Sequence, residues 1–305
     1  ETQIGTIETQ IAVDDGIQAN WVGLLAAPVV DLNAGGVGNN MTTAFTEQTS
    51  VLIAPVGTLS DVDSATLNRL TVTLTARPNG NAVESLSLNA AATTVASGAG
   101  LTVSYTASTG VLLITGTAST ATYQTILQGI LYNNTSDQPT TSNRSITVVA
   151  RDSTNASSTS RTATITVTAV NDAPTIRSLS GDSLAYSEGA GAVVIERGGN
   201  ALVADVDSTN FDTGTLTVSI PAGGDPAEDV LSIRNQGTGA GQIGVSGSTV
   251  TYQGVTIGTF TGGSSGSNLV ITLNSSATPT AVTALVRNIT YQNTDTNAPT
   301  TGART

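Results

Sequence analysis

Two short acidic patterns carry the residues best suited to chemistry: Asp61 with Asp63, and Asp205 with Asp207. Side chains two residues apart on an extended strand point the same way, so each pair can aim two carboxylates at one ion. Residues 170–174 (Val-Asn-Asp-Ala-Pro) add an amide and a further carboxylate. Because Ca²⁺ takes about six to eight oxygen ligands and favours carboxylates and amide oxygens, these residues predict a calcium site.

The composition excludes most other site chemistry. All ten basic residues are Arg, and the chain has no Lys, His or Cys. Ser and Thr nucleophiles therefore lack their usual base, and zinc, copper and haem sites lack their usual ligands. A pair of carboxylates could act as the general acid and the base or nucleophile of a glycosidase. Aromatic residues, however, make up only 3% of the chain and offer few sugar platforms, so we expect no enzymatic activity.

The charge balance bears on the class of partner. The chain carries 22 acidic and 10 basic residues, a formal net charge of −12. A nucleic-acid partner needs a basic patch, and the scattered Arg residues form none. A membrane-spanning helix needs about 18 or more consecutive apolar residues, and the sequence contains no such run. We therefore expect neither a nucleic-acid partner nor a membrane-spanning segment.

The secondary-structure pattern is almost purely β. Segments rich in β-branched and apolar residues are separated by clusters of Gly, Asn, Asp, Ser and Pro about every 8–12 residues, a spacing typical of antiparallel sandwiches. Short helices are expected at residues 121–128 and 281–287, and tight turns at residues 79–80 and 109–110. The clearest predicted strands are residues 70–76, 101–106, 111–115, 146–150 and 162–168.

An internal repeat sets the domain organisation. The Asp-x-Asp pattern is followed by Leu-Thr-Val-Thr-Leu in the first unit and by Leu-Thr-Val-Ser-Ile in the second. Residues 130–135 match residues 289–294, and each match is followed by an Arg, Arg144 or Arg304. The sequence therefore predicts an all-β protein of two tandem antiparallel Greek-key β-sandwiches, residues 27–172 and 173–305, after an extended N-terminal arm of residues 1–26.

The second unit is expected to lack its last strands. After Arg144 the first unit continues through two more predicted strands, which have no counterpart after Arg304. One interpretation is that the sequence is a fragment, or that its tail has been removed. The other is that a segment of a neighbouring molecule completes the sheet by strand donation, which would build a head-to-tail filament. The expected donor is the arm, with one face formed by Ile7, Thr9, Ile11 and Val13.

From Ala27 onward the chain resembles the bacterial cadherin-like repeats of large surface and secreted, adhesin-type proteins. In that family, each Ig-like β-sandwich has a Glu after its first strand, then Asp-x-Asp, and ends in an Asn-Asp-x-Pro linker. Here Glu47, the two Asp-x-Asp patterns and the Asn-Asp-Ala-Pro linker at residues 171–174 appear in that order. The order of these elements makes the resemblance fairly specific.

The resemblance implies two calcium sites. It implies an interdomain site formed by Glu47, Asn171, Asp172, Asp205 and Asp207, and a half-site at the outer tip of the first unit formed by Asp61, Asp63 and Asp152. The chain departs from eukaryotic cadherins in residues 116–128, which contain no acid where those proteins supply another pair. The alternative interpretation is that these acids only cap loop turns, as Asp and Asn commonly do.

These observations favour a structural or adhesive protein of a bacterial surface or biofilm matrix, secreted and extracellular, with Ca²⁺ stiffening its tandem sandwiches. Its partners would be other copies of itself or a cell-surface or matrix ligand. The alternative is a spacer or stalk that presents another domain of a larger secreted enzyme or adhesin.

Overall fold

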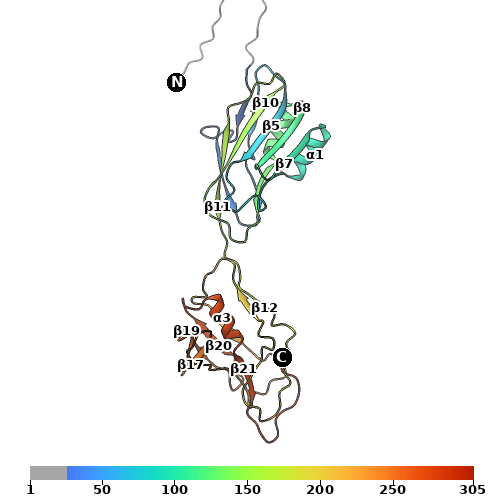
Figure 1. Cartoon of the computed structure of the whole chain (residues 1–305). Helices are drawn as coiled ribbons and strands as arrows, with labels where there is room; N and C mark the ends of the chain where they lie inside the picture. The colour runs from blue at the N-terminus through green and yellow to red at the C-terminus, as the bar shows by residue number, and fades with distance from the viewer. Residues whose placement is uncertain (1–25) are drawn as a thin grey trace, which may run out of the picture. The chain divides into compact units, whose positions relative to one another are not determined.

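The computed structural model describes residues 26–305, which divide into two compact units (Figure 1). Unit 1 ends at Thr168 and unit 2 extends from Ala169 to Thr305, so the division falls slightly before the predicted boundary at residue 172. Apart from Ala26, the expected arm lies outside the described residues, and so do its proposed donor residues Ile7, Thr9, Ile11 and Val13. No helix within residues 26–305 is long and apolar enough to span a membrane.

Unit 1 is a β-sandwich built around one large sheet (Figure 1). All five strands that the sequence predicts for this unit are present. In spatial order, the six-stranded sheet consists of β2 (Met41–Thr46), β11 (Arg161–Thr168), β10 (Arg144–Asp152), β5 (Thr66–Leu74), β8 (Val111–Ser119) and β7 (Thr102–Thr106). The smaller sheets are β3 (Val51–Leu52), β9 (Ile130–Asn134) and β6 (Glu84–Leu88), and the pair β1 (Val29–Asp31) and β4 (Thr58–Ser60).

One strand pair differs from the expected antiparallel arrangement. Strand β2 pairs with β11 in parallel, from Met41 opposite Ala163 to Thr46 opposite Thr168. Parallel neighbours need a long connection, and here nearly the whole unit lies between the two strands. The pairing joins the beginning of the unit to its end. Turn residues in the sequence predict only pairs of consecutive strands, so they do not predict this pair.

The core of unit 1 follows from strict alternation along β5. Leu70, Val72 and Leu74 are fully buried, whereas the Thr residues between them are only partly buried. The predicted helix near residue 121 is α2 (Thr120–Gln128), which buries Tyr123, Ile126 and Leu127 against this core. A second helix, α1 (Ala90–Gly98), was not predicted; it begins after Asn89, whose side chain accepts a hydrogen bond from the Ala92 N–H (2.8 Å).

Unit 2 repeats the sandwich with a smaller main sheet (Figure 1). The predicted helix near residue 281 is α3 (Pro279–Val286). The five-stranded sheet consists of β15 (Thr215–Val218), β20 (Leu269–Leu273), β19 (Val255–Thr261), β18 (Thr249–Tyr252) and β17 (Ile243–Ser246). The others are β13 (Val193–Val194), β21 (Ile289–Asn293) and β16 (Asp229–Ile233), and the pair β12 (Thr175–Arg177) and β14 (Leu202–Ala204).

Strand β15 is the counterpart of β5, because both carry the repeated Leu-Thr-Val pattern after the Asp-x-Asp. In unit 1, β5 lies between β8 and β10. In unit 2, β15 pairs with β20 on one side, and no strand of residues 169–305 pairs with it on the other. The two units therefore differ on the side of this strand where unit 1 has β10, as the comparison of the two sequence repeats predicts.

A tyrosine, a carboxylate and an arginine form the same network in each unit. In unit 1, Glu84 accepts a hydrogen bond from the Tyr132 hydroxyl (2.9 Å) and pairs with Arg144 at 2.9 Å. In unit 2, Asp229 accepts from the Tyr291 hydroxyl (2.6 Å) and pairs with Arg304 at 2.9 Å. The two arginines of the sequence repeat therefore occupy equivalent structural positions.

Candidate metal centre

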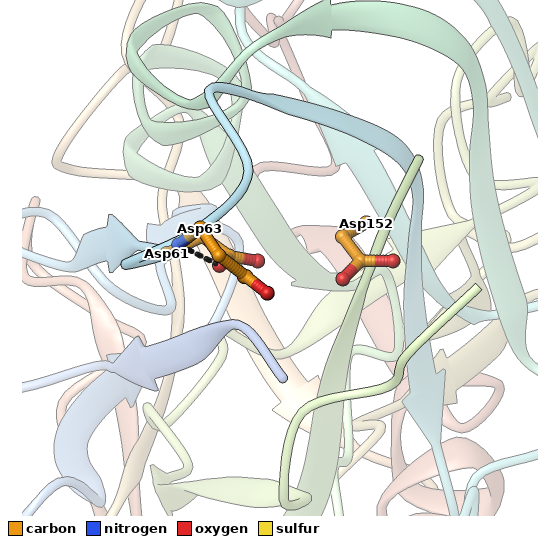
Figure 2. A group of neighbouring side chains, drawn as sticks. All are labelled: Asp61, Asp63 and Asp152. Carbon is orange, nitrogen blue, oxygen red and sulfur yellow. Dashed lines mark hydrogen bonds between the residues drawn. The ribbon is translucent and has the colours of Figure 1, made fainter. Parts of the chain in front are cut away.

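Three carboxylates meet at one end of unit 1. Asp61 directly follows β4, Asp63 lies two residues further along the same loop, and Asp152 is the last residue of β10. Figure 2 shows Asp152 facing the other two across a short gap. The structure thus brings together the three residues expected at the outer tip of this unit.

The spacing of the three carboxylates fits one calcium ion. One oxygen from each residue lies within 4.8 Å of the other two. Two ligands of the same Ca²⁺, each about 2.3–2.6 Å from the ion, are separated by at most about 5.2 Å. Among residues 26–305, this is the one group of three acidic side chains that meets this spacing within a unit.

Asp152 is the most informative member of the group, because its side chain is completely buried. Its Oδ1 accepts hydrogen bonds from the Thr154 N–H (2.8 Å), the Thr154 hydroxyl (2.9 Å) and the Ala156 N–H (2.8 Å). Its Oδ2 is also buried, and no donor within the described range bonds to it. A buried carboxylate oxygen without a partner is costly, and a bound cation would remove that cost.

The environment of Asp61 also favours a cation. Its Oδ1 accepts from the N–H groups of Asp63 and Ser64, both at 3.2 Å, and no donor in residues 26–305 bonds to its buried Oδ2. Burial and the neighbouring carboxyl of Asp63 raise the pKa of Asp61 above its usual value. The Ala26 N–H donates to Asp63 Oδ2 (2.8 Å) and lowers the pKa of that residue.

Unit 2 reproduces the Asp-x-Asp half of this arrangement. Asp205 Oδ1 accepts from the N–H groups of Asp207 (3.3 Å) and Ser208 (2.9 Å). The Asp172 N–H donates to Asp207 Oδ2 (3.0 Å), as the Ala26 N–H does to Asp63. Burial acts to raise the pKa of Asp205, but the hydrogen bonds from Ser208 and Asp207 outweigh it, so this pKa lies below its usual value.

Four of the five residues expected in the interdomain site belong to unit 2. Asp172, Asp205 and Asp207 are neighbours within unit 2, and the Asn171 side-chain amide donates to the carbonyl oxygen of Asp172 (2.8 Å). Glu47 belongs to unit 1, where it is buried just after β2. A site that combines Glu47 with the other four residues stays a prediction.

The cap interpretation and the metal interpretation apply to different oxygens of the same residues. Oδ1 of Asp61, Asp152 and Asp205 accepts backbone N–H groups, as expected of loop caps. Oδ2 of Asp61 and Oδ2 of Asp152 accept no hydrogen bond from residues 26–305 and are the oxygens that could bind a metal ion. Sequence reasoning did not find the Ala26 and Asp172 N–H donors, because backbone groups leave no signal in residue types.

Residues 26–305 thus form an all-β fold, and the three carboxylates of unit 1 are a candidate site for a hard cation. No protein-family model and no curated protein matches this chain.

Proposed function

We propose that this protein is a calcium-binding structural module, and that Asp61, Asp63 and Asp152 hold one Ca²⁺ in unit 1. The observation that carries the proposal is the buried Oδ2 of Asp152, which lacks a hydrogen-bond partner within residues 26–305 and belongs to a group of oxygens spaced for one ion. Backbone carbonyls and water would supply the remaining ligands.

The ligand chemistry favours Ca²⁺ over other divalent cations. Three carboxylates are hard oxygen donors, and the chain has neither the His nor the Cys that zinc sites commonly use. Mg²⁺ usually keeps several of its waters and requires nearly ideal octahedral geometry. Ca²⁺ accepts irregular coordination, which suits a site formed by a loop and the end of a strand.

The biological role we propose is that of an extracellular structural or adhesive protein of a bacterial surface or matrix. Calcium bound at a strand end would link the loop after β4 to the end of β10 and make this part of the sandwich stiffer. The resemblance to cadherin-like repeats and the all-β fold support this role. The second candidate is a spacer that presents another domain, which the repeated sandwich also supports.

Calcium titration of the full chain tests the metal proposal. A ligand that binds only the folded state stabilises it by about 2.7 kcal/mol at a free concentration about 100 times its Kd. We expect calcium to slow amide exchange in unit 1, EDTA to reverse this, and D152N to abolish it. Measurement unit by unit is needed, because a two-domain chain need not unfold in one step.

The matched control is D205N, which changes the Asp-x-Asp of unit 2 and leaves Asp152 intact. D205N should preserve the calcium response of unit 1. A wild-type unit 1 with the same exchange rates in calcium and in EDTA would refute the proposal.

A bead assay separates the adhesive role from the spacer role. Beads coated with the full chain should clump in calcium and disperse in EDTA if the module itself adheres. Beads that stay apart in both conditions would favour the spacer.

A further inference from the structure

A polar hollow in unit 2 gathers three of the ten arginines of the chain. Its volume is about 560 Å³, and its lining includes Arg197, Arg234 and Arg287. Arg197 lies in the loop after β13, Arg234 directly follows β16, and Arg287 caps the C-terminus of α3. In a chain with a net charge of −12, these side chains form a local concentration of positive charge.

Two of the three guanidinium groups are held in place through Nε. The Arg287 Nε–H donates to the Ala201 carbonyl oxygen (2.8 Å). The Arg234 Nε–H donates to Oδ1 of Asn288 (2.7 Å), a buried residue whose own side-chain amide donates to the Ala284 carbonyl oxygen (2.8 Å). No acceptor within residues 26–305 bonds to the terminal N–H groups of either guanidinium. Both groups are therefore fixed in position with donors left for a ligand.

Unit 1 makes the corresponding hydrogen bonds without arginine. By the strand pairing of β6 with β9 and of β16 with β21, Arg287 corresponds to Gln128 and Arg234 to Asn89. The Gln128 side-chain amide donates to the Gly57 carbonyl oxygen just before β4 (2.8 Å), and Arg287 donates to the carbonyl oxygen just before β14. The fold therefore needs a donor at this position but no positive charge.

The end of α3 is open because unit 2 lacks a counterpart of α1. In unit 1, α1 follows β6 and lies against α2, so closely that a Cβ on Gly129 would lie 2.3 Å from the Cβ of Ala92. In unit 2, residues 234–242 form no helix, and the chain continues into the hairpin of β17 and β18. The position of Gly129 is therefore free to carry the larger Asn288, which holds Arg234.

One carboxylate, that of Glu196, also lines the hollow, and backbone groups bind both of its oxygens. Oε1 accepts from the N–H groups of Asn200 (2.7 Å) and Ala201 (2.9 Å), and Oε2 accepts from the Gly199 N–H (2.8 Å). Burial acts to raise the pKa of Glu196, but these hydrogen bonds and the charge of Arg287 outweigh it, so the pKa lies below its usual value. Three arginines against one glutamate leave the lining positive.

The neutral part of the lining suits a sugar. Gln236 and Thr280 offer hydrogen-bonding groups, Tyr252 offers an aromatic ring, and the hollow is much larger than a single inorganic anion. We propose that it binds an anionic sugar, whose carboxylate or phosphate group lies against Arg234 and Arg287. A planar guanidinium can donate two parallel hydrogen bonds to either group. The proposal goes beyond the calcium site and does not depend on it.

Calorimetric titration of the full chain tests the ligand class. The probes are digalacturonate and glucose 6-phosphate, compared with their uncharged counterparts galactobiose and glucose in a calcium-free buffer. At least one anionic sugar should bind about tenfold or more tightly than its uncharged counterpart, because hydrogen bonds to charged groups are the stronger ones. The tighter of the two identifies the carboxylate or the phosphate. Equal binding of charged and uncharged sugars, no binding, or equally tight binding of inorganic phosphate overturns the proposal.

Two variants test the site. R287Q and R234N introduce the residues that unit 1 carries at these positions, so the amide exchange of buried residues in unit 2 should not change. Each should weaken binding of the anionic sugar by about tenfold or more. The matched control is R69Q, which removes the same charge from an exposed residue of unit 1 and should bind like the wild type.

If one of the two variants unfolds unit 2, the other still decides. Unchanged binding in the hollow variants, or an equal loss in R69Q, overturns the proposal. Because the buffer contains no calcium, this result is independent of whether unit 1 binds the metal.

Discussion

Units 1 and 2 share their local hydrogen bonds but differ in how deeply those bonds are buried. The Asp-x-Asp loops accept the same three backbone N–H groups, and both Tyr–carboxylate–Arg networks are present. The Arg144 and Glu84 side chains are both 0% exposed, whereas Arg304 is 13% exposed. The repeated sequence therefore reproduces the local hydrogen bonds. The burial of the ion pair differs between the units, as does the edge strand: β10 lies beside β5, and no strand of residues 169–305 takes that place beside β15.

The largest difference should come from the two arginines. Removing one partner of a buried ion pair costs about 3–5 kcal/mol, because the other charge stays buried and unpaired. We expect R144A to destabilise unit 1 by this amount. R304A should destabilise unit 2 by less, about 1–3 kcal/mol, because water reaches its more exposed pair. Amide exchange of buried residues in each unit measures both values, and equal losses would contradict the comparison.

A matched pair of core leucines should give the next largest difference. Truncating a fully buried Leu to Ala costs about 2–5 kcal/mol, which includes the cavity left behind. L70A should lower the free energy of unfolding of unit 1 within that range. L216A should cost unit 2 about half as much, since Leu216 is only half-buried. Amide exchange of buried residues in each unit measures both costs, and an L216A cost as large as that of L70A would show that half-burial is not the cause.

The helix N-caps should show no difference between the units. The Ser119 hydroxyl accepts from the Thr122 N–H at the start of α2 (3.1 Å), and the Thr278 hydroxyl accepts from the Ala281 N–H at the start of α3 (3.3 Å). Loss of such a cap costs about 1 kcal/mol. S119A and T278A should therefore destabilise their own units equally, as measured by amide exchange. A clear inequality would mean that the covering strand also affects local bonds.

The smallest effect should be a difference in sign between Asp61 and Asp205 in EDTA. A raised pKa means that Asp61 contributes stability below its unfolded pKa near 3.8, which is lost as the pH rises through the folded value. A lowered pKa means that Asp205 contributes stability above its unfolded pKa, which is lost as the pH falls through the folded value. At pH 7, D61N should leave unit 1 unchanged or slightly more stable, and D205N should weaken unit 2. Amide exchange of buried residues in each unit checks this, and a loss of stability in both units would contradict it.

Strongly alternating strands could be predicted from the sequence, and weakly patterned elements could not. In β5, Leu70, Val72 and Leu74 alternate with Thr residues. Asn-Gly and Thr-Gly turns mark the ends of the neighbouring strands. The sequence therefore predicts β5, β7 and β8. Helix α1 was missed because it buries only Ala92 and Ala96, which make no apolar stripe. The candidate site was predictable in residue types, since Asp152 ends a clear strand. The unpaired Oδ2 atoms of Asp61 and Asp152 could not be predicted, because they depend on which hydrogen-bond donors the fold brings close to them.

The parallel pairing of β2 and β11 has a mechanical consequence. The chain enters β2 at one end of the pair and leaves β11 at the other, so tension along the chain loads the six paired positions from Met41–Ala163 to Thr46–Thr168 in shear. Loaded this way, the hydrogen bonds share the force and must break together, whereas bonds pulled open from one end break one after another. Every strand pair within residues 169–305 is antiparallel. A stretched unit 1 would be held by six paired positions that share the load.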